Sequence, residues 1–366
     1  IGLIGVILTF FFAKTFAGEK VAYLTTSLLA TDPSYIFYIR HDFGPVAVMM
    51  VCKMASLILL IHWWRSNPRL NRGLIFLILA SLALGLGFWD KFNFIWFIAA
   101  LLLTMWVLYP KELRLRNGYK LILIASFTAL VAGIVFLIYY KAFGFYPSGF
   151  SGAIAVRFWV LRKVLDGTYL ARMILGQDSL LYQSFLPYLF YISFGFFPLV
   201  LIKKYDRKYL FIPLIILFIF AQVVVTRQAL NGHHVLMLYP FIHLFCATAF
   251  VSVFDYLREK WVRVKPVLCV LSILIVFTIA SNLLTLNSFY RELNRGGGRG
   301  YWTDAIYDVV EFLRGNQSGA SKVVCLDWGY QLNILFLSGG KVDATTCDYI
   351  YGERVTDGLV RLFDDR

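Results

Sequence analysis

Long apolar runs, separated by short polar loops, repeat along the first 290 residues of the chain. A helix needs about 20 mostly apolar residues to cross a bilayer, because lipid offers the backbone no hydrogen-bond partners. The pattern therefore predicts a polytopic bundle of transmembrane helices, mainly α in fold class. The predicted spans are 21–38, 45–64, 73–89, 92–109, 121–140, 185–202, 209–225, 235–254 and 266–286, with 1–12 as the end of one more.

The polar loops are alternately rich and poor in Arg and Lys. The rich loops hold 2, 3, 4, 4 and 4 such residues; they are 13–20, 65–72, 110–120, 203–208 and 255–265. The short loops between them hold one each; they are 39–44, 90–91 and 226–234. Because Arg- and Lys-rich loops stay on the cytoplasmic side of a membrane, the poor loops are predicted to be extracytoplasmic.

Composition agrees with this topology. Of the 366 residues, 60% are hydrophobic, which is well above the usual content of a soluble domain. The net charge of +14 lies mainly in the loops of one side, which argues against nucleic acid as a partner. The first residue is Ile1, inside an apolar run, so we expect the chain to be a fragment that lacks an N-terminal span and loop.

One extracytoplasmic loop, 141–184, is long enough to have structure of its own. It contains an amphipathic stretch in which Arg157, Arg162 and Lys163 are interleaved with aromatic and aliphatic residues. Such a stretch predicts a helix at the membrane interface. Two interpretations stay open: the helix is only a connector, or its cations bind a lipid phosphate. With this loop, residues 1–286 form the predicted membrane domain.

The region 287–366 predicts a small extracytoplasmic α/β domain, because helical and strand patterns alternate in it. Gly296–Gly300 is a predicted hinge before it. Helices are expected at 302–314, 332–337 and 355–363, with a strand at 322–327. Cys325 and Cys347 lie in this domain, where a disulfide is permitted, and the sequence leaves their pairing open.

Three polar clusters lie in the Arg- and Lys-poor loops. The first, Arg40-His41-Asp42, combines a carboxylate that can accept a proton or bind a divalent metal with an imidazole that can do either. The alternative is an ion pair at the end of a helix, without a role in chemistry.

The second cluster, Asp90-Lys91, makes up nearly the whole turn between two spans. Gly85 and Gly87 precede it and are expected to let the helices approach closely. Lys91 can present its ammonium group to a phosphate, with Asp90 beside it. Alternatively, Lys91 extends to the lipid headgroups and pairs with Asp90.

The third cluster runs from Arg227 to His233-His234 at the head of a predicted span. An Arg and a His here can stabilise the charge that develops on a phosphate. Because adjacent side chains on a helix diverge, we expect only one of the two histidines to point inward. Lys53 lies within a span, where a cation is a candidate functional residue.

Three stretches resemble, in order, spacing and side, the motifs of the GT-C superfamily of membrane glycosyltransferases. They are Ser27–Pro33 leading to Arg40-His41-Asp42, then Gly85–Lys91, then Gly232–Pro240. The closer resemblance is to dolichyl-phosphate-mannose–protein mannosyltransferases and lipid A aminoarabinose transferases. Val235 departs from this pattern, because the family usually has Tyr at that position.

The resemblance implies sugar transfer from a polyprenyl-phosphate donor to a lipid, glycan or protein acceptor on the extracytoplasmic face of a bacterial inner membrane. It implies metal or substrate orientation for Asp42 and phosphate contact for Lys91 and His234. It also implies that the principal catalytic Asp precedes Ile1. A divalent metal, Mg²⁺ or Mn²⁺, is left open as a cofactor, with Asp42 as its candidate ligand.

His41 is a candidate catalytic residue beside Asp42. The other residues of the three clusters and the cations of the interfacial stretch are candidates for binding the donor; they are Arg40, Asp90, His233, Arg227, Arg157, Arg162 and Lys163. A transporter or a flippase for lipid-linked sugars is the alternative function. It predicts charged groups near the bilayer midplane, along a path open to both sides.

Overall fold

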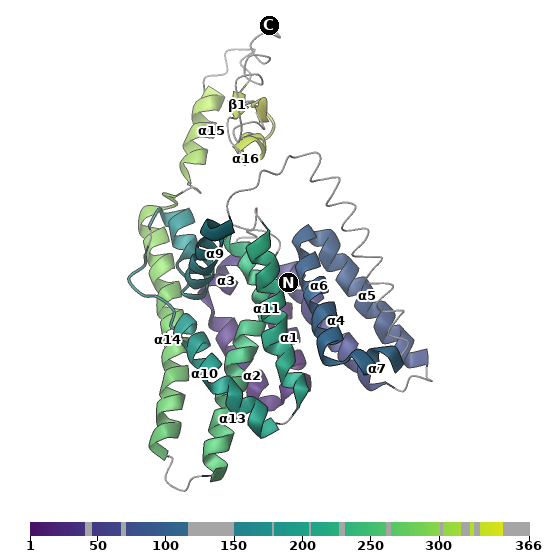
Figure 1. Cartoon of the computed structure of the whole chain (residues 1–366). Coiled ribbons are helices and arrows are strands. Elements are labelled where there is room, and N and C mark those ends of the chain that lie inside the picture. The colour runs from purple at the N-terminus through teal and green to yellow at the C-terminus, as the bar shows by residue number, and fades with distance from the viewer. Residues whose placement is uncertain are drawn as a thin grey trace. The chain divides into compact units, whose positions relative to one another are not determined.

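A computed structural model of the chain divides it into two units (Figure 1). The helical unit comprises Ile1–Leu170 and Asp178–Phe289, and the C-terminal unit comprises Ala171–Gln177 and Tyr290–Arg366. The residues described are 1–40, 46–66, 71–115, 150–177, 179–204, 206–226, 231–260, 265–300, 303–315, 323–325 and 330–346.

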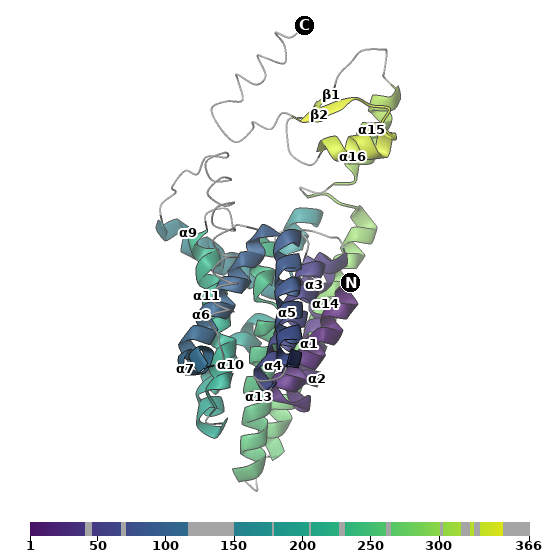
Figure 2. The same ribbon diagram turned by 90° about the vertical axis from the view of Figure 1, so that its right-hand side faces the viewer.

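The described residues of the helical unit include five helical segments long and apolar enough to cross a membrane. They are α4 (Val46–Arg65), α5 (Asn71–Asp90), η3 with α11 (Arg207–Leu210 and Phe211–Val225), α13 (Phe241–Lys260) and α14 (Lys265–Gly296). Shorter apolar helices run beside them (Figure 2): α1 (Gly2–Ala17), η1 with α6 (Phe92–Phe94 and Ile95–Leu108) and α10 (Leu186–Lys204). The predicted helical bundle is thus confirmed, while the predicted span 121–140 lies outside the described residues.

Two predicted spans are interrupted. The span predicted at 21–38 consists of α2 (Glu19–Thr31) and α3 (Pro33–Arg40), with Asp32 extended between them at ψ 120°. Proline has no N–H and disfavours the helical conformation in the residue before it, so the helix must break here. The Asp32 carboxylate then accepts a hydrogen bond from the Tyr35 N–H, at 2.9 Å, and caps α3.

The second interruption lies before α13. The apolar pattern predicted a span at 235–254, but α13 begins at Phe241. It is preceded by the short helices α12 (Gly232–Val235) and η4 (Leu236–Leu238) and by a cis peptide bond at Tyr239–Pro240. Apolarity could not reveal this boundary, because the residues on both sides of it are equally hydrophobic.

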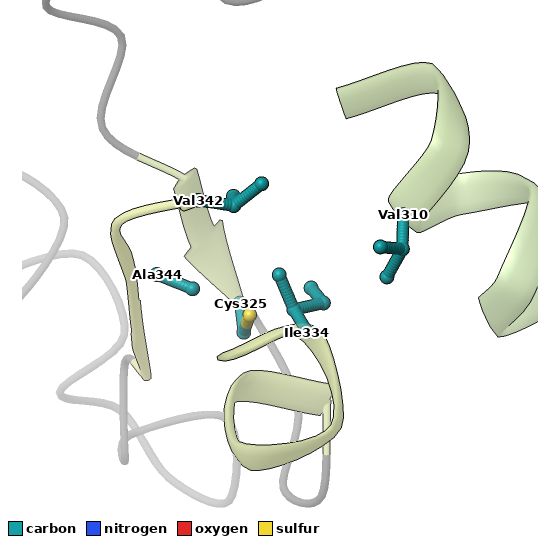
Figure 3. Close-up of a cluster of buried hydrophobic side chains, with 5 residues drawn as sticks. All are labelled: Val310, Cys325, Ile334, Val342 and Ala344. Carbon is teal, nitrogen blue, oxygen red and sulfur yellow. The ribbon is translucent and has the colours of Figure 1, made fainter. Parts of the chain in front are cut away.

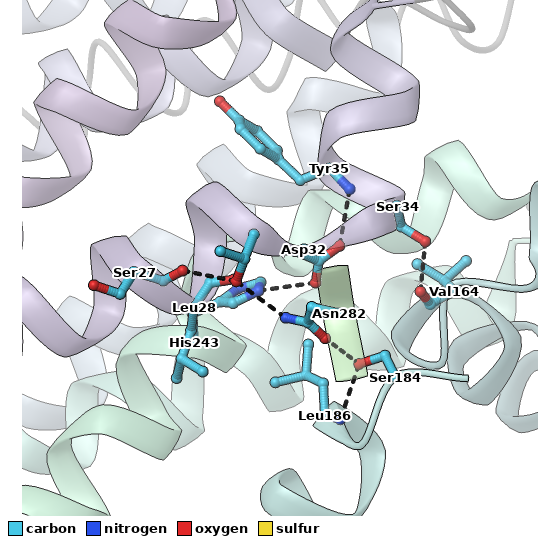
Figure 4. Close-up of polar contacts among 11 residues, drawn as sticks. Ser27, Leu28, Asp32, Ser34, Tyr35, Val164, Ser184, Leu186, His243 and Asn282 are labelled. Carbon is cyan, nitrogen blue, oxygen red and sulfur yellow. Dashed lines mark hydrogen bonds and ion pairs between the residues drawn. The ribbon is translucent and has the colours of Figure 1, made fainter. Parts of the chain in front are cut away.

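Two buried polar contacts hold the interrupted segments in place. His243 of α13 lies 3.0 Å from the Asp32 carboxylate (Figure 4), and both side chains are fully buried. Lys53 of α4 donates to the Met237 carbonyl at 2.8 Å, with the rings of Phe97 and Phe241 beside its ammonium group. Polar groups inside an apolar bundle are costly unless they are hydrogen-bonded, so these contacts fix how the segments pack.

A second polar chain lies next to Asp32. Ser184 contacts Asn282 of α14, and Asn282 donates to the hydroxyl of Thr31, at 3.3 Å (Figure 4). Ser34 donates to the Val164 carbonyl at 2.6 Å, which joins α3 to the end of α9 (Phe150–Leu165). The break at Asp32 is therefore connected to three other segments of the unit.

The Arg- and Lys-rich ends of the helices lie together. Arg65 at the end of α4 donates to the Thr15 carbonyl of α1, at 3.0 Å. Arg207 donates to the Leu108 carbonyl of α6 and pairs with Glu112 of α7 (Pro110–Leu115). We call this the basic end of the helical unit. Its assignment to the cytoplasm stays a prediction.

The C-terminal unit contains a small α/β core (Figure 3). Strands β1 (Val323–Cys325) and β2 (Ala344–Thr346) pair in parallel, and helices α15 (Ala305–Gly315) and α16 (Tyr330–Ser338) contribute Val310 and Ile334 to the core. Over the described residues, the helices expected at 302–314 and 332–337 and the strand expected at 322–327 are confirmed by α15, α16 and β1.

Local details of the C-terminal unit follow its sequence. The Thr303 hydroxyl accepts a hydrogen bond from the Ala305 N–H at 3.2 Å, as expected for the start of a helix. Cys325 is buried and its thiol is free. Cys347 and the helix predicted at 355–363 lie outside the described residues. The short π-helix η2 (Ala171–Leu175) also belongs to this unit.

The buried Asp32–His243 pair gives a first prediction. His243→Leu removes the side-chain partner of a fully buried carboxylate, so we expect a loss of about 3–5 kcal/mol in the free energy of unfolding. The double variant Asp32→Asn/His243→Leu should lose less, because Asn carries no charge and keeps an oxygen for the Tyr35 N–H. Unfolding in detergent, followed by tryptophan fluorescence, measures both.

His62→Leu is the matched control, since it removes an exposed histidine of α4. Its free energy of unfolding should change by no more than about 0.5 kcal/mol. A double variant as unstable as His243→Leu alone would show that the buried charge is not what makes the pair important.

Candidate functional site

The turn between α5 and α6 places Lys91 at the end of the bundle opposite the basic end. The Lys91 N–H continues the hydrogen bonding of α5 to the Gly87 carbonyl, and the Lys91 carbonyl accepts from the Phe94 N–H at 2.9 Å. A Cβ atom at Gly87 would lie 2.6 Å from the Phe94 ring, so glycine is what allows this tight turn. The close approach predicted for Gly85 is wrong, because nothing lies within 4 Å of a Cβ atom built there.

His233 and His234 lie on the single turn of α12. Their ring centroids are 4.1 Å apart, and the His234 ring lies 5.6 Å from the Trp96 ring of α6. Both residues are half-buried, so burial does not single out one of them as pointing inward, and that expectation stays a prediction. The prediction assumed a long regular helix, whereas α12 ends after four residues.

Arg157 approaches the same place from α9. Its side chain is 1% exposed, and its guanidinium group donates to the Thr226 carbonyl beyond α11, at 2.9 Å. The neighbouring Phe158 and Trp159 are exposed, at 54% and 41%. The amphipathic pattern of α9 therefore has its aromatic residues outside and this one cation inside.

The two histidines have strongly lowered pKa values. Burial lowers the pKa of His233 to about 2, with the charges of His234 and Lys91 adding to the effect. Burial, followed by the charges of Lys91 and Arg157, lowers the pKa of His234 to about 4. Both imidazoles are therefore neutral at physiological pH, beside two permanent cations.

Lys91, Arg157, His233 and His234 thus form one group, which we call the basic cluster. Its members come from three separate parts of the chain: the α5–α6 turn, α9 and α12. Neutral imidazoles and cations in a partly buried site can donate hydrogen bonds to an anion and stabilise its charge. Such a cluster suits a phosphate group.

Other predicted site residues lie elsewhere or cannot be placed. Arg162 is exposed and Lys163 is half-buried. The charges of both side chains lower the pKa of the Asp166 carboxyl group, against the larger effect of burial. Arg40 ends α3 and is exposed, and Asp90 ends α5 and is half-buried. His41, Asp42 and Arg227 lie outside the described residues.

Asp166 is a buried carboxylate that the sequence did not single out. It accepts hydrogen bonds from the Thr168 N–H and hydroxyl, at 2.9 and 2.5 Å, and Gly167 between them has a φ of 77°. Burial raises the pKa of Asp166, against the effect of those hydrogen bonds. Its contacts are those of a residue that shapes a turn.

The buried contacts of Asp32 and Lys53 hold the basic cluster in position. Asp32 contacts His243, and Lys53 bonds to Met237. Both partners lie within ten residues after His233 in the chain, so these contacts also restrict the position of the two histidines. Gly232 packs so closely on the Tyr38 hydroxyl of α3 that a Cβ atom would overlap it. Two features of the sequence could have pointed to this arrangement. They are the Asp32-Pro33 pair and His243, which are polar residues within apolar runs.

A metal site cannot be built from the described residues. Among them, no three His, Cys, Asp or Glu side chains are placed to hold a metal ion. Asp42, the predicted ligand, is outside this set, so we derive no step through a metal.

No protein-family profile and no curated protein sequence matches the chain. Solved structures do. ArnT from Cupriavidus metallidurans in the apo state is 13% identical, with a TM-score of 0.55 over 99% of this chain and 72% of that one. ArnT from the same organism bound to undecaprenyl phosphate is 12% identical, with a TM-score of 0.52 over 98% and 72% of the two chains.

The archaeal oligosaccharyltransferase AglB from Archaeoglobus fulgidus is also similar, in a complex with an inhibitory peptide and a dolichol-phosphate. It is 12% identical, with a TM-score of 0.51 over 92% of this chain and 51% of that one. Similarity at this level of identity concerns the fold. The chain has the fold of the GT-C glycosyltransferases, as its sequence motifs predicted.

The two lowered pKa values predict how stability depends on pH. In the unfolded chain a histidine titrates near 6.5, whereas His233 and His234 stay neutral in the fold down to pH 4 or lower. Below pH 6.5 the unfolded state therefore binds more protons, and stability falls as the pH falls from about 6.5 to 4. The variant His233→Gln/His234→Gln should lose less of its thermal midpoint between pH 7 and pH 5 than the wild type.

The control is His62→Gln, which removes a histidine outside the cluster and should keep the wild-type pH dependence. Equal losses in the wild type and the double variant would mean that the two imidazoles are not buried as neutral groups.

Proposed function

We propose that the chain is a membrane glycosyltransferase, or the membrane part of one, that moves a sugar from a polyprenyl-phosphate donor to a lipid, glycan or protein acceptor. The reaction takes place at the end of the bundle that carries the basic cluster, which is the extracytoplasmic face if the charge pattern sets the orientation. The observation that carries the proposal is the convergence of Lys91, Arg157 and His234 from three segments of the chain.

The chemistry requires a carboxylate and a phosphate site. An acceptor hydroxyl attacks the anomeric carbon, the bond between that carbon and the phosphate oxygen breaks, and the hydroxyl proton passes to a carboxylate. The lipid phosphate leaves with an extra negative charge. We propose that Lys91 and Arg157 stabilise this charge, and that His234 donates a hydrogen bond to it.

Asp42 is our candidate for orienting the sugar or the acceptor, with or without a divalent metal. The proposal rests on its place in the sequence motif, directly after Arg40 at the end of α3. The folds of ArnT and AglB add support, because ArnT has been solved bound to undecaprenyl phosphate and AglB in complex with a dolichol-phosphate.

A transporter is the alternative function, and the buried groups near the middle of the bundle bear on it. Lys53, Asp32 and His243 are each no more than 1% exposed; Asp32 and His243 contact each other, and Lys53 donates to the Met237 carbonyl. Groups that line a transport path need access to water or substrate. These contacts favour a structural role for the buried groups, and thereby favour the transferase.

Binding of undecaprenyl phosphate to the purified chain tests the proposal. Lys91→Ala removes one charged donor to the phosphate, worth about 1.5–3 kcal/mol, so the dissociation constant should rise about ten- to a hundredfold. Native mass spectrometry or tryptophan fluorescence measures it. Lys14→Ala, which removes an exposed lysine of the basic end, should bind as the wild type does.

Asp42→Asn separates binding from chemistry. It should leave the binding of undecaprenyl phosphate unchanged while lowering sugar transfer in membranes that contain the protein. Equal affinities of the wild type and Lys91→Ala would remove the phosphate site from the proposal, and unchanged transfer by Asp42→Asn would remove the role of that residue.

A further inference from the structure

A cavity of about 320 Å³ lies inside the helical unit, apart from the basic cluster. Its walls are formed by α1, α4, α5, α6 and α11, mostly through aliphatic and aromatic side chains such as Phe12, Leu57 and Leu101. This volume is within the usual range of about 300–1,000 Å³ for sites that bind small molecules.

The charged residues that line the cavity lie at the basic end, and we call this part its mouth. They are Arg65, Asp206 and Lys208, and beside them the rings of Trp64 and Tyr109 are tilted to each other with centroids 5.3 Å apart. Tryptophan and tyrosine favour the level of the lipid headgroups in membrane proteins. The mouth is therefore placed where a lipid headgroup would lie.

The charges at the mouth are unevenly compensated. Lys208 pairs with Asp206 at 3.3 Å. Arg65 donates to the backbone carbonyl of Thr15, and no carboxylate among the described residues forms an ion pair with it. One cationic group thus remains at the mouth for an anion.

The cavity extends along α5 away from the basic end. Ser81 and Gly85 of α5 line it, and Gly85 lies 14 residues beyond Asn71, the first residue of α5. That is about 21 Å along the helix axis, more than half of a hydrocarbon core about 30 Å thick. Gly85 is exposed, and a Cβ atom built there would meet nothing within 4 Å, so the cavity is open at this glycine and a larger side chain there would narrow it.

We propose that the cavity binds one chain of an anionic phospholipid from the leaflet at the basic end, with the phosphate of its headgroup on Arg65. The apolar walls and the depth suit a long hydrocarbon chain, and the single uncompensated guanidinium group suits one negative charge. This lipid is distinct from the proposed donor, because Lys91 lies at the opposite end of α5.

The test is native mass spectrometry of the purified chain with phosphatidylglycerol or phosphatidylcholine added in detergent. The wild type should retain one molecule of phosphatidylglycerol in preference to phosphatidylcholine. Gly85→Leu adds a side chain at the end of the cavity away from Arg65 and should reduce the retained phosphatidylglycerol at least about tenfold, as expected for a loss of about 1.4 kcal/mol. Arg65→Gln should retain both lipids equally.

Gly195→Leu is the matched control. Gly195 lies in α10, does not line the cavity and likewise has nothing within 4 Å of a Cβ atom, so the same side chain is added to open space elsewhere. It should retain phosphatidylglycerol as the wild type does. Retention by Gly85→Leu at the wild-type level, or equal retention of the two lipids by the wild type, would overturn the proposal.

The result is independent of the proposed transferase activity. Lys91→Ala should retain phosphatidylglycerol as the wild type does, even though its binding of undecaprenyl phosphate is weakened. Displacement of phosphatidylglycerol from the wild type by undecaprenyl phosphate would show that the cavity belongs to the donor, and would overturn the proposal.

Discussion

The need to satisfy polar groups within an apolar bundle is the constraint on which this structure depends. Lipid cannot replace a lost backbone hydrogen bond, so each interrupted helix requires a partner inside the protein. At the break at Asp32–Pro33, the Asp32 carboxylate contacts His243 and accepts a hydrogen bond from the Tyr35 N–H. At the break before α13, Lys53 donates a hydrogen bond to the Met237 carbonyl. These contacts restrict how the segments of the basic cluster pack, because a shift would leave a buried polar group without its partner.

The two ends of the helical unit have different chemistry. At the basic end, cations contact backbone carbonyls and carboxylates, as in the pairs of Arg65 with Thr15 and Lys20 with Asp255. At the other end, Lys91 and Arg157 lie beside two imidazoles whose pKa values are lowered by burial. At the first end, Arg65 is a single cation without a carboxylate partner among the described residues, whereas two cations and two imidazoles lie together at the second end. The proposed reaction therefore belongs to the second end.

Apolar periodicity and loop charge predicted most of the helices and the end at which the polar clusters meet. They did not predict the breaks at Asp32 and before Phe241, because a search for long apolar runs passes over a short polar stretch such as Asp32-Pro33, and the residues on both sides of Pro240 are hydrophobic. Lys91 and His234 could be selected from the sequence by their motifs, whereas the burial of Arg157 depends on which face of α9 packs against Thr226. The Asp32–His243 pair joins residues 211 positions apart, and no local pattern carries such a contact. The motifs pointed to the GT-C fold, and the similarity to ArnT and AglB agrees with them.

The most direct test of this account is an experimental structure of the chain with undecaprenyl phosphate bound. The account predicts phosphate density within hydrogen-bonding distance of Lys91 and His234, close to the guanidinium group of Arg157. Density for the phosphate at the basic end, or along Lys53 and the Asp32–His243 pair in the interior, would contradict it. The first result would place the leaving group of a glycosyl transfer at the basic cluster, and the second would assign the buried groups to a path through the bundle.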